Sequence, residues 1–77
     1  MKASPNATQR RLVRSLAVDW LHDVLTTGFD PSAVMMLVGA MTVADEVAFM
    51  CNRHDPAFVH HLRSFALDAM RAHRRVA

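Results

Sequence analysis

The sequence predicts an all-α fold, with one domain over residues 1–77 that contains three helices. Composition points to helices, because the chain has two glycines, no tyrosine and no isoleucine, whereas strands favour β-branched and aromatic residues. Apolar residues also recur every three or four positions over most of the chain, as they do along one side of a helix. Finally, each periodic segment follows a dipeptide made of a capping residue and proline: Ser4-Pro5, Asp30-Pro31 and Asp55-Pro56.

We expect each of these dipeptides to open a helix. Ser and Asp side chains accept hydrogen bonds from the free amides of a first turn, and proline is favoured at the first helical position. Gly28 and Asn52 follow the first and second periodic segments, and both residue types are typical helix stops. The predicted helices therefore span about 5–27, 31–51 and 56–74, with residues 1–7 flexible.

The first and third helices are predicted to be amphipathic, each with one apolar stripe to bury. The stripe of the first contains Leu12, Val13, Leu16, Ala17, Trp20, Leu21 and Val24. The stripe of the third contains Phe58, Val59, Leu62, Phe65, Ala66, Ala69 and Met70. Both helices should pack these stripes against the middle one.

The middle helix is apolar around nearly all of its circumference, which is typical of a buried helix. Its polar strip of Thr42, Asp45 and Glu46 is narrow. Two amphipathic neighbours cover only part of such a helix. A compact monomer that wraps it fully remains an alternative, but we expect a second copy of the chain to cover the rest.

Self-association also compensates for the small size of the chain. A domain of this length buries only about 60% of the surface that its unfolded form exposes, and one cysteine allows no internal disulfide. Each large side chain that a partner buries is worth about 1.5–3 kcal/mol, against a total stability of about 5 kcal/mol. We expect a two-fold dimer, with its interface at Met35, Val38, Met41, Ala44, Ala48 and Phe49.

Arg10, Arg11 and Arg14 lie near the start of the first helix, where positive charge is mildly unfavourable. Helix stability does not explain their position, so they are candidates for binding an acidic surface on a larger protein. The alternative is an ordinary solvated face.

The second functional hypothesis is a basic, dimeric nucleic-acid-binding accessory or transcription-regulating protein. Its phosphate contacts would be Arg71, Arg74 and Arg75. A net charge of +2 is small for such a role. The end of the third helix also favours cations for its own stability, so this hypothesis ranks second.

No pattern of catalytic, metal-binding or cofactor-binding residues is present. Cys51 and His54 are spaced like metal ligands, and His60-His61 follow, but zinc sites use repeated Cys or His pairs. Cys51 falls on an apolar face, where a thiol is unreactive. We therefore predict neither an enzyme nor a cofactor.

The amino-terminal residues are polar and do not form a signal peptide. The apolar stretch Ala33–Ala44 is shorter than the ~20 residues of a membrane span, so we expect a cytoplasmic protein. The profile resembles the small accessory regulators and inhibitors carried by phages and plasmids. The sequence thus predicts a homodimeric protein-interaction module that binds and modulates a larger protein, with inhibition as one form of modulation.

Overall fold

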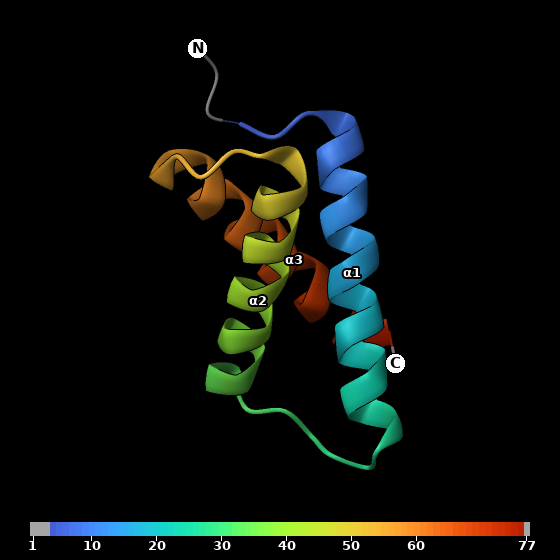
Figure 1. Ribbon diagram of the computed structural model, residues 1–77. Helices are drawn as coiled ribbons and strands as arrows, with labels where there is room; N and C mark the ends of the chain where they lie inside the picture. Colours follow the sequence, from blue (N-terminus) through green and yellow to red (C-terminus); the bar gives the residue numbers. More distant parts are fainter. Residues whose placement is uncertain (1–3, 77) are drawn as a thin grey trace.

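The computed structural model describes residues 4–76 and forms three helices: α1 (Ala7–Thr26), α2 (Ala33–Cys51) and α3 (Pro56–Val76). α1 and α2 lie side by side in opposite directions, and α3 crosses behind both of them (Figure 1). The part of the chain that the structure describes contains no strand, so the all-α prediction is confirmed.

The first helix begins later than predicted, because Asn6 caps it and Ser4-Pro5 does not. The Asn6 side chain accepts a hydrogen bond from the Gln9 backbone amide at 2.8 Å. The Asn6 backbone amide in turn donates to Gln9 Oε1 at 2.9 Å, which completes a capping box. Pro5 is buried in front of this cap. Residues 1–3 lie outside the described residues, and the flexibility of residues 1–7 stays a prediction.

The second helix also begins two residues after its proline. Ser32 is the N-cap, and its hydroxyl oxygen accepts a hydrogen bond from the Met35 backbone amide at 3.2 Å. Pro31 is buried before the helix starts. The prediction that Asp30-Pro31 opens this helix is therefore wrong, because the next residue supplies the capping oxygen.

Only the third dipeptide acts as predicted. α3 begins at Pro56, and the Val59 amide donates to the Asp55 carbonyl oxygen at 3.1 Å. Arg53 donates from Nε to one oxygen of the Asp55 carboxylate and from Nη2 to the other, both at 3.2 Å. These hydrogen bonds hold the pKa of Asp55 below its ordinary value. The same guanidinium lies 3.9 Å from the ring centroid of Phe58.

Both predicted stop signals are confirmed. Gly28 has a φ of 81° and Asn52 a φ of 52°, a left-handed conformation that ends a helix. After α2, the Asn52 amide donates to the Phe49 carbonyl and the Arg53 amide to the Ala48 carbonyl. The last turn of α2 is thereby closed by hydrogen bonds.

The core lies where the three helices meet. α1 and α3 bury members of the stripes predicted for them. The buried apolar side chains are Val13, Ala17, Leu21, Met36, Ala40, Val43, Ala44, Val47, Ala48, Phe58, Leu62, Ala66 and Met70. α2 supplies small or β-branched residues for most of its share, which allows α1 and α3 to approach its backbone closely.

α1 and α2 lie very close together at Gly39. A Cβ atom at this position would lie 2.6 Å from Cζ2 of Trp20, closer than any carbon contact allows. The indole ring therefore occupies the space that a side chain at Gly39 would need. This contact sets the separation of the two helices at that level.

Candidate interaction surfaces

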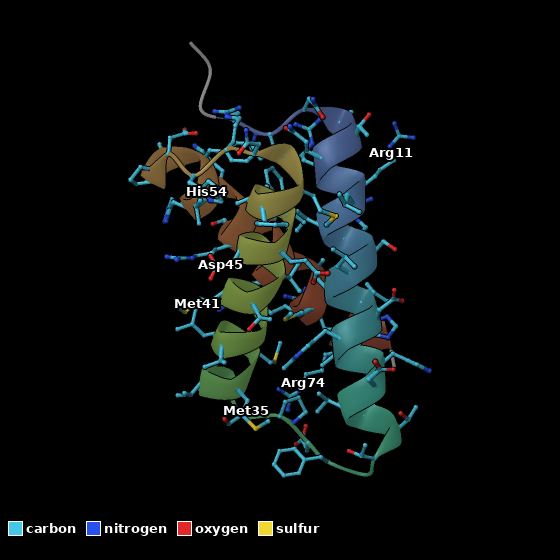
Figure 2. All side chains as sticks on the ribbon, viewed as in Figure 1. Arg11, Met35, Met41, Asp45, His54 and Arg74 are labelled. Atoms are coloured by element: carbon cyan, nitrogen blue, oxygen red, sulfur yellow. The ribbon has the colours of Figure 1, made fainter. Side chains whose placement is uncertain are left out.

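The side of α2 that faces away from α1 and α3 is an apolar stripe, which we call the outer face. Val34, Leu37, Val38 and Met41 are spaced three, four and seven residues apart, so they lie on one side of the helix. Phe49 follows eight residues after Met41 on the same side, with the exposed Asp45 between them. Phe49 is 78% exposed and Val34 70% exposed, and Figure 2 shows Met41 directed away from α1. The outer face consists of Val34, Leu37, Val38, Met41 and Phe49.

The outer face agrees only partly with the predicted interface. Val38, Met41 and Phe49 are exposed on it. Ala44 and Ala48, however, are 0% and 1% exposed and belong to the core of the monomer. These two residues are a correction to the predicted interface: the alanine ridge that permits close packing is used within the chain.

The predicted interface did not include Val34 and Leu37, which are both exposed on the outer face. The small residues of α2 could have shown which of its sides enters the core. Helices approach most closely where side chains are small, so the alanine side of α2 is the inner side and the larger residues point outward.

Met35, the remaining predicted interface residue, is half-buried beside a recess at the start of α2. The recess has a volume of about 330 Å³ and is formed by α1, the α1–α2 connection and α2. Phe29, which is 52% exposed, stands at this recess. We call it the Trp20 recess; its lining residues are Trp20, Asp23, Val24, Thr27, Phe29 and Met35.

Beside the outer face, α2 and α3 form two further hollows that share Leu67. One, of about 340 Å³, is lined by Leu37, Met41, His60, Arg63, Ser64 and Leu67. Arg63 lies 4.0 Å from the Asp45 carboxylate, and its Nε is buried without a hydrogen-bond partner among the described residues. The other hollow, of about 440 Å³, is lined by Ala33, Met36, Leu67, Arg71, Arg74 and Arg75.

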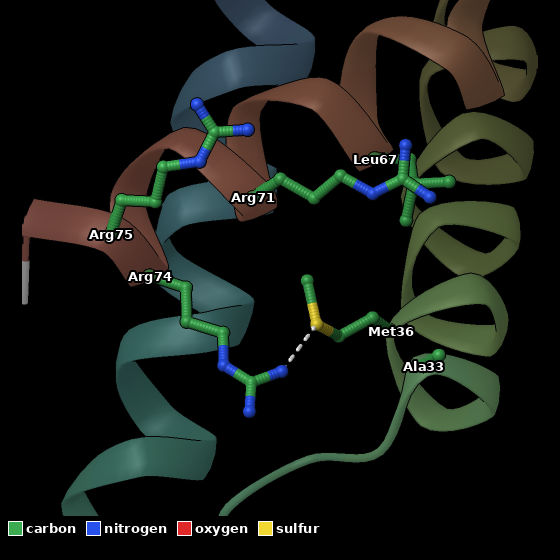
Figure 3. Close-up of a pocket in the computed structure, with 6 residues that line it drawn as sticks. All are labelled: Ala33, Met36, Leu67, Arg71, Arg74 and Arg75. Carbon is green, nitrogen blue, oxygen red and sulfur yellow. Dashed lines mark hydrogen bonds between the residues drawn. The ribbon is translucent and has the colours of Figure 1, made fainter.

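The three arginines predicted to contact nucleic acid meet at this second hollow (Figure 3). Arg74 is already bound within the chain: it pairs with Asp30 at 2.8 Å and donates to the Pro31 carbonyl oxygen at 3.2 Å. Arg71 and Arg75 form no ion pair with any residue between 4 and 76. Two cations, therefore, remain available to an anion outside the chain.

Two of the three arginines predicted to bind a protein partner come together: Arg10 and Arg14 line the same recess, whereas Arg11 lies outside it. Arg10 donates to the Pro5 carbonyl oxygen at 3.0 Å, and its guanidinium lies 5.7 Å from the ring centroid of Phe65. These contacts tie the amino-terminal segment to α3, which gives Arg10 a structural reason for its position. Arg11 is exposed and points away from the other helices in Figure 2.

Arg14 lies in the groove between α1 and α3, which Arg10 also lines. Two adjacent recesses of about 240 and 300 Å³ share Arg14, Ala69 and Ala72. The alanines make the floor of this groove shallow and apolar. Its other lining residues are Arg10, Val18, Phe65, Asp68 and His73.

No three His, Cys, Asp or Glu side chains between residues 4 and 76 come together as metal ligands. Cys51 accepts a hydrogen bond from Gln9 Nε2 at 3.7 Å. The absence of an enzyme activity and of a cofactor stays a prediction.

Within the described residues, α2 alone is long and apolar enough to cross a membrane by length and composition. The core helix of a soluble protein has the same properties, and α2 supplies part of this core. The predicted lack of a membrane span therefore stays a prediction.

The chain matches no protein-family model, and neither a curated protein nor a solved structure is similar to it.

Proposed function

We propose that this chain is a homodimeric protein-interaction module, in which two copies pair through the outer face of α2 and the pair binds a larger protein. The proposal is carried by the outer face itself. Four large apolar side chains are exposed together on one side of α2, and Phe49 is exposed on the same side beyond Asp45. The described residues contain no further element that covers them. Exposed apolar patches mark interaction sites in soluble proteins.

Energetics favour covering the outer face. Complete burial of a Val, Leu, Met or Phe side chain stabilises by about 1.5–3 kcal/mol relative to exposure. The whole domain is expected to have a stability of only about 5 kcal/mol. Covering even two residues such as Val34 and Phe49 therefore adds an amount comparable with the stability of the monomer.

Val38→Asp is expected to convert a dimer into a monomer. Val38 is 55% exposed in the single chain, so the aspartate disturbs the interface and leaves the monomer core intact. Sedimentation equilibrium should give twice the 8.6 kDa chain mass for the wild type and 8.6 kDa for the variant. Circular dichroism should show equal helix content for both proteins.

Ser15→Asp is the matched control, because it places the same residue on an exposed position of α1 away from the outer face. It should remain dimeric. A monomeric wild type would contradict the proposal, and so would a Val38→Asp variant that stays dimeric.

The groove between α1 and α3 is the surface best suited to the larger partner. None of its lining residues belongs to the outer face or to the two hollows beside it, so a dimer leaves it accessible. Arg10 and Arg14 at its sides outnumber Asp68, the one acidic residue among its lining residues. This groove therefore favours an acidic segment of a partner protein.

Arg14→Glu is expected to abolish capture of a partner from a lysate of the source organism, because it reverses the charge in the middle of the groove. Arg11→Glu makes the same change on the same helix but outside the groove, and should leave capture unchanged. The measurement is a tagged pulldown with and without nuclease. Equal capture by both variants would contradict the groove as the partner site.

Loss of the captured material after nuclease treatment would favour the second candidate function, nucleic-acid binding. The observation in its favour is that Arg71, Arg74 and Arg75 meet at one hollow. In that case Arg71→Gln and Arg75→Gln should weaken capture, and Arg14→Glu should have no special effect.

A further inference from the structure

The outer face of α2 is too small to form a stable dimer alone. Even if each of its five side chains had the roughly 150–250 Å² of an aromatic residue, their exposed fractions would leave only about 430–720 Å² of apolar surface. Stable interfaces bury about 800 Å² on each partner. If two copies pair through α2, the contact has to extend onto neighbouring parts of each chain.

The most exposed large apolar side chain and an apolar recess lie at opposite ends of the outer face. Phe49 is 78% exposed near the carboxyl end of α2. The Trp20 recess, of about 330 Å³, opens at the amino end of α2, where Met35 lines it. This recess is open to solvent, and its volume is sufficient to receive an aromatic ring. Buried aromatic anchors dominate the binding energy of many interfaces.

An antiparallel two-fold arrangement brings these two features together. The outer face runs from Val34 to Phe49, so its midpoint falls between Met41 and Thr42. A two-fold axis at this point sets the Phe49 end of each copy against the Val34 end of the other. A parallel pair would instead place the two Asp45 carboxylates beside each other, which is unfavourable. In the antiparallel pair each Asp45 lies opposite Val38 of the other copy and is 4.0 Å from Arg63 of its own chain.

Phe49 and the Trp20 recess also lie on the same side of α2, the side next to α1. At 100° per residue, Phe49 lies on the part of the outer face that is turned toward Met35 and α1 rather than toward α3. A two-fold axis perpendicular to the helices keeps the α1 side of one copy beside the α1 side of the other. Phe49 of the second copy is therefore directed to the Trp20 recess and away from the arginine-lined hollow.

We propose that Phe49 of each copy inserts into the Trp20 recess of the other, so that the dimer is antiparallel and held by two symmetric aromatic anchors. This inference rests on the proposed homodimer and assigns its register. Phe49 contacts Trp20, Phe29 and Met35 of the second copy. These contacts extend the interface from α2 onto α1 and supply the area that the outer face lacks.

Two variants disrupt the contact between Phe49 and the Trp20 recess, one by removing the ring and the other by filling the recess. Phe49→Ala removes the ring, and its matched control is Met50→Ala, an exposed apolar residue next to it on another side of the helix. Asp23→Trp fills the recess from an exposed position on α1, and its control is Asp19→Trp, one turn earlier and outside the recess. Phe49→Ala and Asp23→Trp should each raise the dimer Kd at least about 100-fold, because two anchors are lost.

Mixing the two variants is the decisive experiment. Each homodimer has no anchor, whereas the mixed dimer keeps one: Phe49 of the Asp23→Trp chain enters the open recess of the Phe49→Ala chain. Native mass spectrometry separates the species by mass. The mixed dimer should exceed both homodimers at equal concentrations, and the two control variants should mix statistically at wild-type affinity.

The outcomes distinguish this inference from the proposed function. If Phe49→Ala dimerises like the wild type, or if the mixed dimer is no more abundant than the homodimers, the anchor is wrong. If Val38→Asp abolishes dimerisation in the same series, the homodimer itself stands. If the wild type is monomeric, both proposals fail.

Discussion

Replacement of Gly39 by valine is expected to lower the melting temperature by roughly 12–24 °C. A Cβ atom at Gly39 would lie 2.6 Å from Cζ2 and 2.7 Å from Cε2 of Trp20, and valine adds two methyl groups beyond it. Overpacking of this kind costs about 1–3 kcal/mol, and we expect the upper end because the indole ring lies directly against the α2 backbone. Because the whole domain is expected to have a stability of only about 5 kcal/mol, this substitution removes more than half of its free energy of unfolding.

A double-mutant cycle identifies the clash as the cause. Trp20→Leu removes the ring that meets residue 39, so the loss caused by Gly39→Val should be smaller in the Trp20→Leu background than alone. Thermal melts followed by circular dichroism measure all four proteins. The cycle is best run in the Val38→Asp background, because dimer dissociation otherwise contributes to stability. Strict additivity, or a Gly39→Val protein as stable as the wild type, would contradict the tight crossing of α1 and α2.

The fold class, the three helices and their ends were predictable because these features depend on local chemistry. Periodicity marked the stripes of α1 and α3, and Gly28 and Asn52 marked the two helix ends. The helix starts were predicted less well. Proline fits both the first helical position and the extended segment before a cap, so Pro5 and Pro31 were each assigned to the wrong side of the cap.

The orientation of α2 was harder to predict because its periodicity contains two apolar faces. Hydrophobicity alone does not tell which face enters the core, so Ala44 and Ala48 were assigned to the interface while Val34 and Leu37 were not. Residue size separates the faces once the helices are required to approach closely. The role of Gly39 depends on Trp20, nineteen positions earlier in the chain, and no local pattern connects them.

The arginines show a similar limit. Arg10 stood out because its charge is unfavourable near a helix start, but the structure gives it contacts with Pro5 and Phe65. Arg14 shares a groove with Phe65 and Asp68 of α3 only because α1 and α3 pack together. The groove is formed by residues of two helices, so the spacing of residues along one helix does not predict it.

Cross-linking at position 41 is expected to be nearly complete in this dimer. The two-fold axis between Met41 and Thr42 places residue 41 of one copy beside residue 41 of the other. A Met41→Cys variant, in a Cys51→Ser background that removes the native thiol and keeps an acceptor for Gln9, therefore has its two cysteines across the interface. A Ser15→Cys variant in the same background places an exposed thiol on α1, away from the axis.

The central claim is that two copies pair across the outer face of α2, and this cross-link tests it most directly. Both cysteine variants are treated with a short bis-maleimide at micromolar protein concentration and separated on a denaturing gel. We predict that Met41→Cys runs almost entirely at twice the chain mass, while Ser15→Cys stays at 8.6 kDa. Equal cross-linking of the two variants, or none at position 41, would contradict the claim.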